Sequence, residues 1–171
     1  MKQHIFINMM NPVQDKMYRL ARRLLVSKES AEDAVQEVML KLWARKEKLS
    51  EYDNVEAFAM TVTKNYCLDQ LKLKQNNNLR IVHSNYEDGN NSIQKNLEVQ
   101  DDLNWVQKII ENLPEQQKIL IQLRDVEQYE YDEIAKMTEM QETAIRVALS
   151  RARKKIREEM LKKHRYGIKS N

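Results

Sequence analysis

The sequence has very little of the material that builds turns, cross-links and membrane spans. It holds two Gly, two Pro and one Cys among 171 residues. So few Gly and Pro leave hardly any residues for hairpin turns, which excludes a β-rich fold and predicts an all-α protein. A single Cys excludes a disulfide framework and any cysteine-based metal cluster. No apolar run approaches the length of a membrane span, so no membrane insertion is expected.

Signals for export and for catalysis are also missing. Residues 1–8, MKQHIFIN, lack the apolar core and the small-residue cleavage site of a signal peptide. There is no glycine-rich phosphate loop, and the three His, at positions 4, 83 and 164, have no Cys or carboxylate partner at ligand spacing. We therefore expect a cytoplasmic protein that is not an enzyme and has no catalytic residue, cofactor or metal.

What the sequence does have is charge, unevenly distributed. Charged residues make up 32% of the chain and hydrophobic residues 42%, a balance that suits small amphipathic helices. Residues 146–171 hold ten Lys or Arg against two Glu, a local net charge of +8. Residues 105–145 hold four against nine acids, a local net charge of −5. A basic block at one end of the chain is typical of an edge that binds a polyanion.

The first part of the chain predicts three helices, with a possible short helix before them over residues 5–9. Asn11-Pro12 reads as an N-cap followed by proline at the first helical position, for a helix that runs to about residue 26. A second helix follows from about residue 29 to 46, and 47–54 reads as a loop. Asn54 is a plausible N-cap for the third helix, which we expect to end near residue 74.

Composition changes after residue 74. Residues 75–101 are polar and show no helical period, which predicts a flexible acidic linker. The linker divides the chain into an N-terminal unit, 1–74, with a three- to four-helix bundle, and a C-terminal four-helix unit, 102–171. In the latter, Leu103 and Val126 belong to the apolar sides expected for the first two helices, and Pro114 separates these helices.

The C-terminal unit ends in the pattern of a helix-turn-helix. A short helix, 131–137, and a break at 138–140 precede a long helix from Gln141 to about Lys163. The long helix has an apolar stripe formed by Ile145, Ala148, Leu149, Ala152, Ile156 and Met160. Beside it lies a second stripe of Arg146, Ser150, Arg153 and Arg157. A solvated basic helix that only closes a bundle would show the same pattern.

Two polar clusters stand out in the N-terminal unit. Asp33, Gln36 and Glu37 are three and four residues apart, so they project together and either face water or dock on a basic partner helix. Asn65, Asp69 and Lys72 share a face of the third helix, with Lys64 nearby. Pairing of Asp69 with Lys72 would explain this face, and so would contact with nucleic acid, with Tyr52 on the preceding loop available for stacking.

Several stretches together resemble the extracytoplasmic-function sigma factors, the small two-domain promoter-recognition subunits of bacterial RNA polymerase. The resemblance covers residues 12–74 and 102–163. It rests on YRLARRLL (18–25), AEDAVQEV (31–38) with Trp43, Ala57-Phe58 leading to Lys64-Asn65 and Asp69, LPEQQ (113–117), DEIA (132–135) and ALSRARKKI (148–156). The chain departs from the family's usual glycine in the helix-turn-helix turn, where it has Glu139, and from the usual Ser or Thr before the reading helix, where it has Gln141.

The resemblance implies a transcription initiation factor that binds core RNA polymerase, through its β and β′ subunits, and assists promoter opening. Docking on the β′ clamp helices is implied for Asp33, Gln36 and Glu37. Contact with the minus-10 element is implied for Tyr52, Asn54, Lys64, Asn65, Asp69 and Lys72. Contact with the minus-35 element is implied for Gln141, Thr143, Arg146, Val147, Ser150, Arg151, Arg153, Lys154 and Arg157, with Arg146 on a base edge and Arg151, Arg153, Lys154 and Arg157 on phosphates.

The family further implies a linker that threads toward the polymerase active centre, and an anti-sigma protein as a regulatory partner. A free-standing helix-turn-helix DNA-binding regulator is the alternative, because its C-terminal unit would look the same. Such a regulator, however, has no use for the polar face of Asp33, Gln36 and Glu37. A purely protein-binding helical module would leave the local charge of +8 unexplained.

Overall fold

The computed structural model describes residues 1–78 and 97–168, and every regular element in these residues is a helix, which confirms the all-α prediction. Most of the predicted linker, 75–101, lies outside the described residues. The helices are α1 (Gln3–Leu25), α2 (Lys28–Ala44), α3 (Lys46–Leu49), α4 (Val55–Asn78), α5 (Leu97–Glu111), α6 (Glu115–Ile121), the π-helix η1 (Gln122–Val126), α7 (Tyr131–Thr138) and α8 (Glu142–Ile168).

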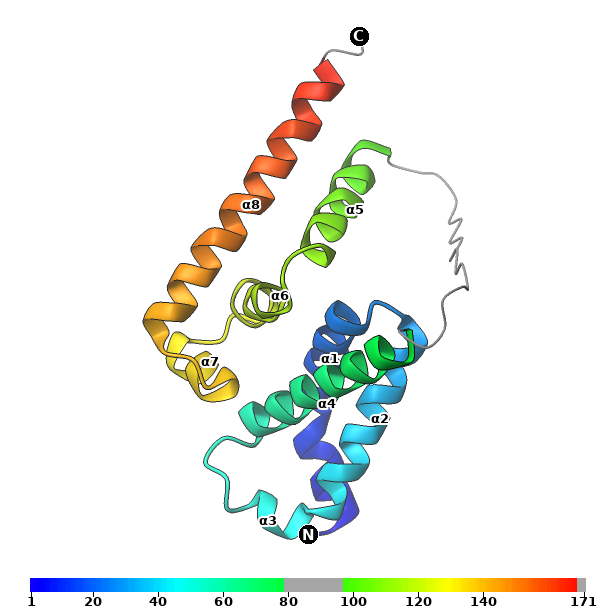
Figure 1. Cartoon of the computed structure of the whole chain (residues 1–171). Coiled ribbons are helices and arrows are strands. Elements are labelled where there is room, and N and C mark those ends of the chain that lie inside the picture. The colour runs from blue at the N-terminus through cyan, green and yellow to red at the C-terminus, as the bar shows by residue number, and fades with distance from the viewer. Residues whose placement is uncertain (79–96, 169–171) are drawn as a thin grey trace.

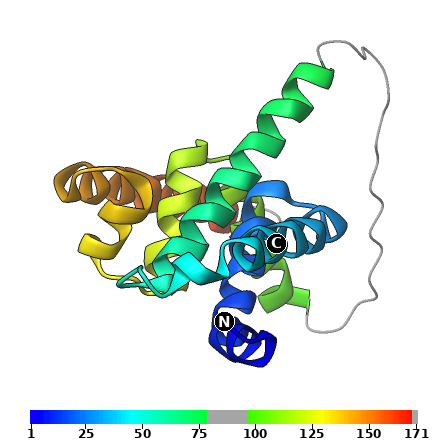
Figure 2. The same cartoon turned by 90° about the horizontal axis from the view of Figure 1, so that it is seen from below.

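In the N-terminal unit, α1, α2 and α4 pack against one another (Figure 1). The Ser27 side chain accepts a hydrogen bond from the Ser30 N–H at 3.3 Å and so caps α2. The Asn54 Oδ1 accepts from the Ala57 N–H at 2.9 Å, the cap that the sequence predicts for α4. The last turns of α4 extend beyond the other helices (Figure 2), and Leu73 there is exposed.

The N-terminal helices differ from the sequence expectation in two places. α1 is one continuous helix that passes through Pro12, because Phe6 and Met10 before the proline are buried in the same core as Val13 after it. Their burial offsets the backbone hydrogen bond that proline removes. Residues 47–49, expected in the loop, form the short helix α3 together with Lys46, and Leu49 in it is fully buried.

The helical regions also reach further toward the linker than the sequence predicts. α4 continues to Asn78 and α5 begins at Leu97, so both ends of the predicted linker are helical. Neither stretch contains Gly or Pro, so nothing in the chain stops the helix where the composition becomes polar.

In the C-terminal unit, α8 packs against α5, α6 and α7. The apolar stripe predicted for α8 is the side that packs, since Ile145, Leu149 and Ala152 are fully buried. Leu103 and Val126, expected on apolar sides, are instead exposed. For Val126 the reason is η1, where the Glu127 N–H donates to the Gln122 carbonyl at 3.0 Å, five residues back. This wider turn rotates Val126 off the buried side.

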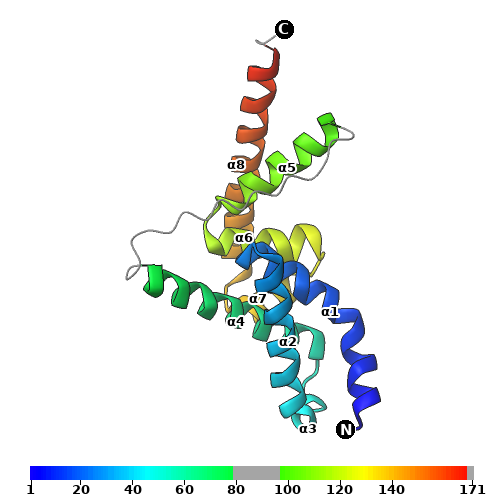
Figure 3. The same ribbon diagram turned by 90° about the vertical axis from the view of Figure 1, so that its right-hand side faces the viewer.

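The two units share one hydrophobic core. α1 packs against α6 and η1, α4 packs against α7, and the buried side chains of both units form one contiguous cluster. Figure 3 shows α6 and α7 seated beside α1 and α4, with α8 directed away from the N-terminal unit. Within the described residues, no helix combines the length and the apolar character needed to cross a bilayer.

Two leucines on neighbouring helices test the assignment of the core. Leu20 on α1 is fully buried, whereas Leu40 on α2 is 62% exposed. Leu20→Ala is expected to lower the free energy of unfolding by about 2–5 kcal/mol. Leu40→Ala is expected to change it by no more than about 0.5 kcal/mol. Urea denaturation followed by circular dichroism measures both, and equal losses would contradict the packing of α1.

Candidate nucleic-acid interface

The turn between α7 and α8 is fixed by local hydrogen bonds and one unusual backbone conformation. Glu130 and Glu133 form a capping box at the start of α7, in which the Glu130 N–H donates to Glu133 Oε2 at 3.0 Å. α7 ends at Thr138, and Glu139 follows in the left-handed region, with φ 57° and ψ 26°. The Ile145 N–H donates to the Gln141 carbonyl at 3.0 Å and starts α8. These parts form the predicted helix-turn-helix, with Glu139 in the conformation that glycine usually adopts.

The first turns of α8 present their polar side to solvent. Gln141, Thr143, Arg146, Val147 and Ser150 are all exposed, so this side of α8 is accessible to a binding partner. Val147 is the apolar member of this surface and is 49% exposed, which suits contact with a thymine methyl group.

The Arg146 side chain is held above the ring of Tyr131 on α7. Its guanidinium lies 4.0 Å from the ring centroid, and that of Arg124 lies 4.6 Å from the same ring. Glu142, one turn earlier on α8, lies 4.0 Å from the Arg146 guanidinium. A cation stacked on an aromatic ring loses little mobility when it binds, so Arg146 is oriented before any contact with a base.

The four predicted phosphate contacts are not equivalent. The Arg153 guanidinium donates to both carboxylate oxygens of Asp125, at 3.1 and 2.5 Å, and these bonds raise the pKa of Arg153. Lys154 lies 3.9 Å from Glu158. Arg151 and Arg157 are exposed and have no ion pair with a described residue. Arg153 therefore also joins α8 to η1, while Arg151 and Arg157 are the cations most available to a phosphate.

A cavity of about 200 Å³ between α2 and α4 gathers part of the predicted minus-10 surface. Asn65 and Asp69 line it, together with Phe58, Tyr66, Lys41 and Arg45. The Tyr52 ring stacks on Phe58, with centroids 4.0 Å apart and planes inclined by 14°, so Tyr52 lies at the edge of this cavity. Asn54 caps α4, so its side-chain oxygen already accepts a hydrogen bond from the backbone. Lys72 lies further along α4 and is exposed.

Lys64 points away from this cavity. Its Nζ donates to the carbonyl of Met137 on α7 at 2.8 Å, and burial lowers the pKa of Lys64. The family resemblance assigns Lys64 to the minus-10 surface together with Asn65 and Asp69. Adjacent residues on a helix are rotated by about 100°, so Lys64 instead faces the C-terminal unit.

The polar cluster on α2 is intact, and its two carboxylates lie near Tyr66 of the α2–α4 cavity. Asp33, Gln36 and Glu37 are all exposed. Gln36 also lines an apolar groove of about 550 Å³, whose other members are Gln3, Phe6, Ile7, Gln14, Met39, Leu40 and Trp43. Phe6 and Trp43 meet edge to face in this groove, with centroids 5.2 Å apart. An exposed polar edge beside an apolar groove has the composition of a protein-binding surface.

Sequence reasoning missed the cations of the α2–α4 cavity and most of the apolar groove. Lys41 and Arg45 come from α2 and its C-terminal end, whereas the whole predicted minus-10 set lies on α4 and the loop before it. Residues from separate helices gather only when the bundle forms. One feature of the sequence does indicate the apolar groove: Leu40 interrupts an otherwise polar side of α2.

Comparisons with known proteins match each half of the chain to a known family of domains. Residues 9–76 match the family described as sigma-70 region 2, and residues 103–156 match sigma-70, region 4. None of the curated protein sequences is a significant match. Among solved structures, the chain is similar to the sigma factor RpoE from Bartonella quintana, crystallised in complex with the anti-sigma factor NepR. The TM-score is 0.73 at 22% identity, over 92% of this chain and 96% of that chain, which shows a shared fold.

The conformation of Glu139 yields a test of the turn. A residue with a Cβ is strained in the left-handed region, whereas glycine is not. Glu139→Gly is therefore expected to raise the free energy of unfolding by about 0.5–1 kcal/mol relative to Glu139→Ala, which removes the carboxylate but keeps the strain. Thermal unfolding compares the two variants, and a glycine variant no more stable than the alanine variant would contradict this backbone geometry.

Proposed function

The chain belongs to the sigma-70 family, in its extracytoplasmic-function class, and we propose that it performs the family's task through three separate surfaces. It is a transcription initiation factor that directs RNA polymerase to promoters. The observation that supports the proposal is the position of the two matches: region 2 coincides with the unit of α1–α4, and region 4 with the unit of α5–α8. We assign these units to 1–74 and 102–171, with the linker between them.

The polymerase-binding surface is the exposed edge of α2. Asp33, Gln36 and Glu37 offer two carboxylates and an amide to the basic side of the β′ clamp helices. The adjacent groove, with Leu40 and Ile7 exposed at its rim, adds the apolar area that carboxylates alone do not provide.

The minus-10 surface is the α2–α4 cavity with its aromatic edge. Capture of an unstacked base needs a stacking platform and a few fixed donors and acceptors. Tyr52 and Phe58 supply the platform, and Asn65 supplies both a donor and an acceptor. Lys41 and Arg45 at the same cavity supply positive charge for the neighbouring phosphates.

The minus-35 surface is the start of α8 in the major groove. Arg146, oriented by Tyr131, contacts a base edge, while Arg151 and Arg157 contact phosphates.

Family membership extends the proposal to location, chemistry and partners. Sigma factors are not enzymes, and we propose that this chain catalyses no reaction itself and works in the cytoplasm, where promoter DNA and polymerase are found. The Bartonella sigma factor is held by an anti-sigma factor. By analogy, this chain is proposed to have an anti-sigma partner.

Run-off transcription with core polymerase tests the α2 surface. Glu37→Lys is expected to abolish the specific transcript, because a cation would face the basic clamp helices. Lys28→Glu, an exposed reversal at the start of α2, is the matched control and keeps the transcript. A full transcript from Glu37→Lys would remove this surface from the proposal. No transcript from the wild type, without co-purification of core polymerase, would favour the free-standing regulator.

The two classes of arginine on α8 are separated by their salt dependence. In holoenzyme binding to promoter fragments, Arg146→Ala is expected to cost about 1–3 kcal/mol on the cognate minus-35 sequence and little on a scrambled one. Arg157→Ala is expected to weaken binding to both sequences alike and to reduce the slope of log affinity against log salt by about 1. A sequence-independent loss from Arg146→Ala would contradict its assignment to a base edge.

A further inference from the structure

The side of α1 that meets the C-terminal unit carries four cations at spacings of three and four residues, namely Lys16, Arg19, Arg22 and Arg23. Like charges at this spacing share a face of the helix and repel one another unless acidic groups compensate them. Lys16 Nζ donates to Glu56 at 2.7 Å and lies 5.2 Å from the centroid of the Tyr129 ring. The Arg19 guanidinium donates to both carboxylate oxygens of Glu127, at 2.6 and 2.8 Å. The first two cations of the row are therefore compensated.

The last two cations of the row are not compensated in this way. Arg22 donates to the Val26 carbonyl, and Arg23 Nε donates to Gln122 Oε1 at 3.1 Å. Both acceptors are neutral, and neither arginine forms an ion pair with a described residue. Burial lowers the pKa of Arg23, and the attraction of Glu111 on α5 opposes this only in part. The end of α1 thus keeps positive charge that the chain itself does not neutralise.

These guanidiniums also keep spare hydrogen-bond donors. The two Nη atoms of Arg23 donate to no described residue. Throughout the described parts of the chain, every fully buried side-chain nitrogen or oxygen has a partner, so both Nη atoms are accessible to solvent. Arg22 uses one Nη for the Val26 carbonyl, and Arg19 uses Nε and one Nη for Glu127. Each of the three guanidiniums therefore retains at least one nitrogen that can donate to an oxyanion.

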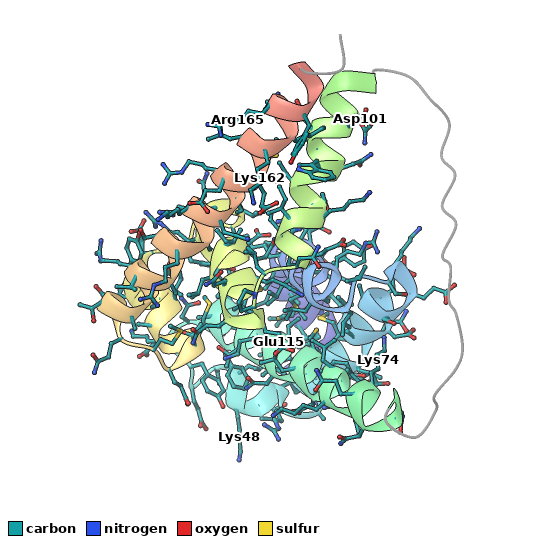
Figure 4. The ribbon with its side chains drawn as sticks, turned by 45° about the horizontal axis from the view of Figure 1, so that its top comes forward. Lys48, Lys74, Asp101, Glu115, Lys162 and Arg165 are labelled. Atoms are coloured by element: carbon teal, nitrogen blue, oxygen red, sulfur yellow. The ribbon has the colours of Figure 1, made fainter. Side chains whose placement is uncertain are left out.

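The three arginines line one cavity of about 310 Å³. Its opposite wall consists of Gln107 and Glu111 near the end of α5 and of Gln122 in η1. Figure 4 shows Asp101, near the start of α5, at the end of that helix that lies away from α1. Gln122 is 1% exposed and forms the floor of the cavity, whereas Arg22 is exposed and lies at its mouth. Cavities that bind small molecules begin at about this volume.

Two exposed valines, Val26 and Val126, complete the cavity and give it an apolar part. The backbone of Val26 has a φ of 65° and a ψ of −44°, which a β-branched residue rarely adopts. Its N–H donates to the Arg22 carbonyl at 3.0 Å, and its carbonyl accepts from the Arg22 guanidinium, so Arg22 holds this turn. Strained residues of this kind gather at sites that clamp ligands.

The charge around the cavity favours one class of ligand. Glu127 neutralises Arg19, so Arg22 and Arg23 against Glu111 leave a net charge of +1. A cation would be repelled, and a neutral ligand would leave this charge in place. A phosphate group carries a charge of about −1.5 to −2 at pH 7 and has three strong acceptor oxygens. Three oxygens can accept from all three guanidiniums, whereas a carboxylate has only two.

We propose that the cavity between the end of α1, α5 and η1 binds a small molecule that carries a single phosphate group. Arg22 and Arg23 bind the phosphate oxygens, Arg19 adds its spare N–H, and the two valines contact the rest of the molecule. The cavity shares no residue with the surfaces assigned to polymerase and promoter DNA. It therefore gives the chain a ligand that promoter recognition does not require.

Isothermal titration calorimetry on the full-length protein tests the site, with inorganic phosphate as the probe and with ionic strength held constant. Wild type is expected to bind one phosphate per chain. Acetate, which offers one oxygen fewer, is expected to bind about 10-fold more weakly or less well still, because one charge-assisted hydrogen bond is lost.

Single substitutions identify the residues that bind phosphate. Arg22→Gln and Arg23→Gln are each expected to weaken phosphate binding about 10-fold or more, because each removes a charged donor. Glu111→Gln removes the carboxylate that faces the phosphate and is expected to tighten binding about 2- to 5-fold. Lys136→Gln is the matched control, since it removes the same charge from an exposed position on α7 outside the cavity, and it keeps wild-type affinity.

Three results would overturn the proposal: no saturable binding of phosphate by wild type, acetate binding as tight as phosphate, or an equal loss in Lys136→Gln and Arg23→Gln. Binding lost in Arg157→Ala but kept in Arg23→Gln would place the phosphate on the DNA-binding side of α8 instead. Should the arginine variants fail to fold by circular dichroism, NMR of wild type decides. The Nε–Hε signals of Arg22 and Arg23 are expected to shift on addition of phosphate, and unmoved signals would refute the site.

Discussion

The apolar side of α1 is the constraint on which both halves of the molecule depend. Its buried residues recur at helical spacing over almost the whole helix and pack against α2 and α4. The same helix also contacts α6 and η1 of the C-terminal unit. α1, together with α4 where it packs against α7, thus makes one core from two small units, each of which alone would bury limited surface. Its polar positions Lys16, Arg19 and Arg23 then determine how the second unit is oriented.

Most of the fold could be predicted from the sequence, because the helical spacing of apolar residues is visible within each short stretch of the chain. Scarce glycine and proline excluded strands, and Asn54 marked a helix start that the structure confirms. The errors occurred where tertiary packing overrides local signals. Pro12 looks like a helix start, yet the core holds residues on both sides of it. Val126 fits a 3.6-residue period, which a π-turn interrupts.

The candidate sites were less predictable than the fold, for a physical reason. A surface formed by one helix, such as Asp33, Gln36 and Glu37 on α2 or the reading side of α8, is visible in the spacing of its residues. A surface formed by several helices is not. Lys41 and Arg45 reach the α2–α4 cavity only after the bundle has formed, and Lys64 faces α7 although its sequence neighbour Asn65 faces the cavity. Contacts of this kind depend on tertiary geometry.

The bond between Arg19 and Glu127 joins positions 108 residues apart, in two units that the chain connects through a polar linker. The sequence of either unit alone does not show that Arg19 and Glu127 depend on each other. Recombination between related genes could exchange one half and leave each half able to fold, yet the new pair of surfaces would not fit. The two halves are therefore constrained to be inherited together, and a substitution at either position favours a compensating change at the other. In hybrid proteins assembled from two such factors, the fit between halves matters as much as the DNA sequence that each half reads.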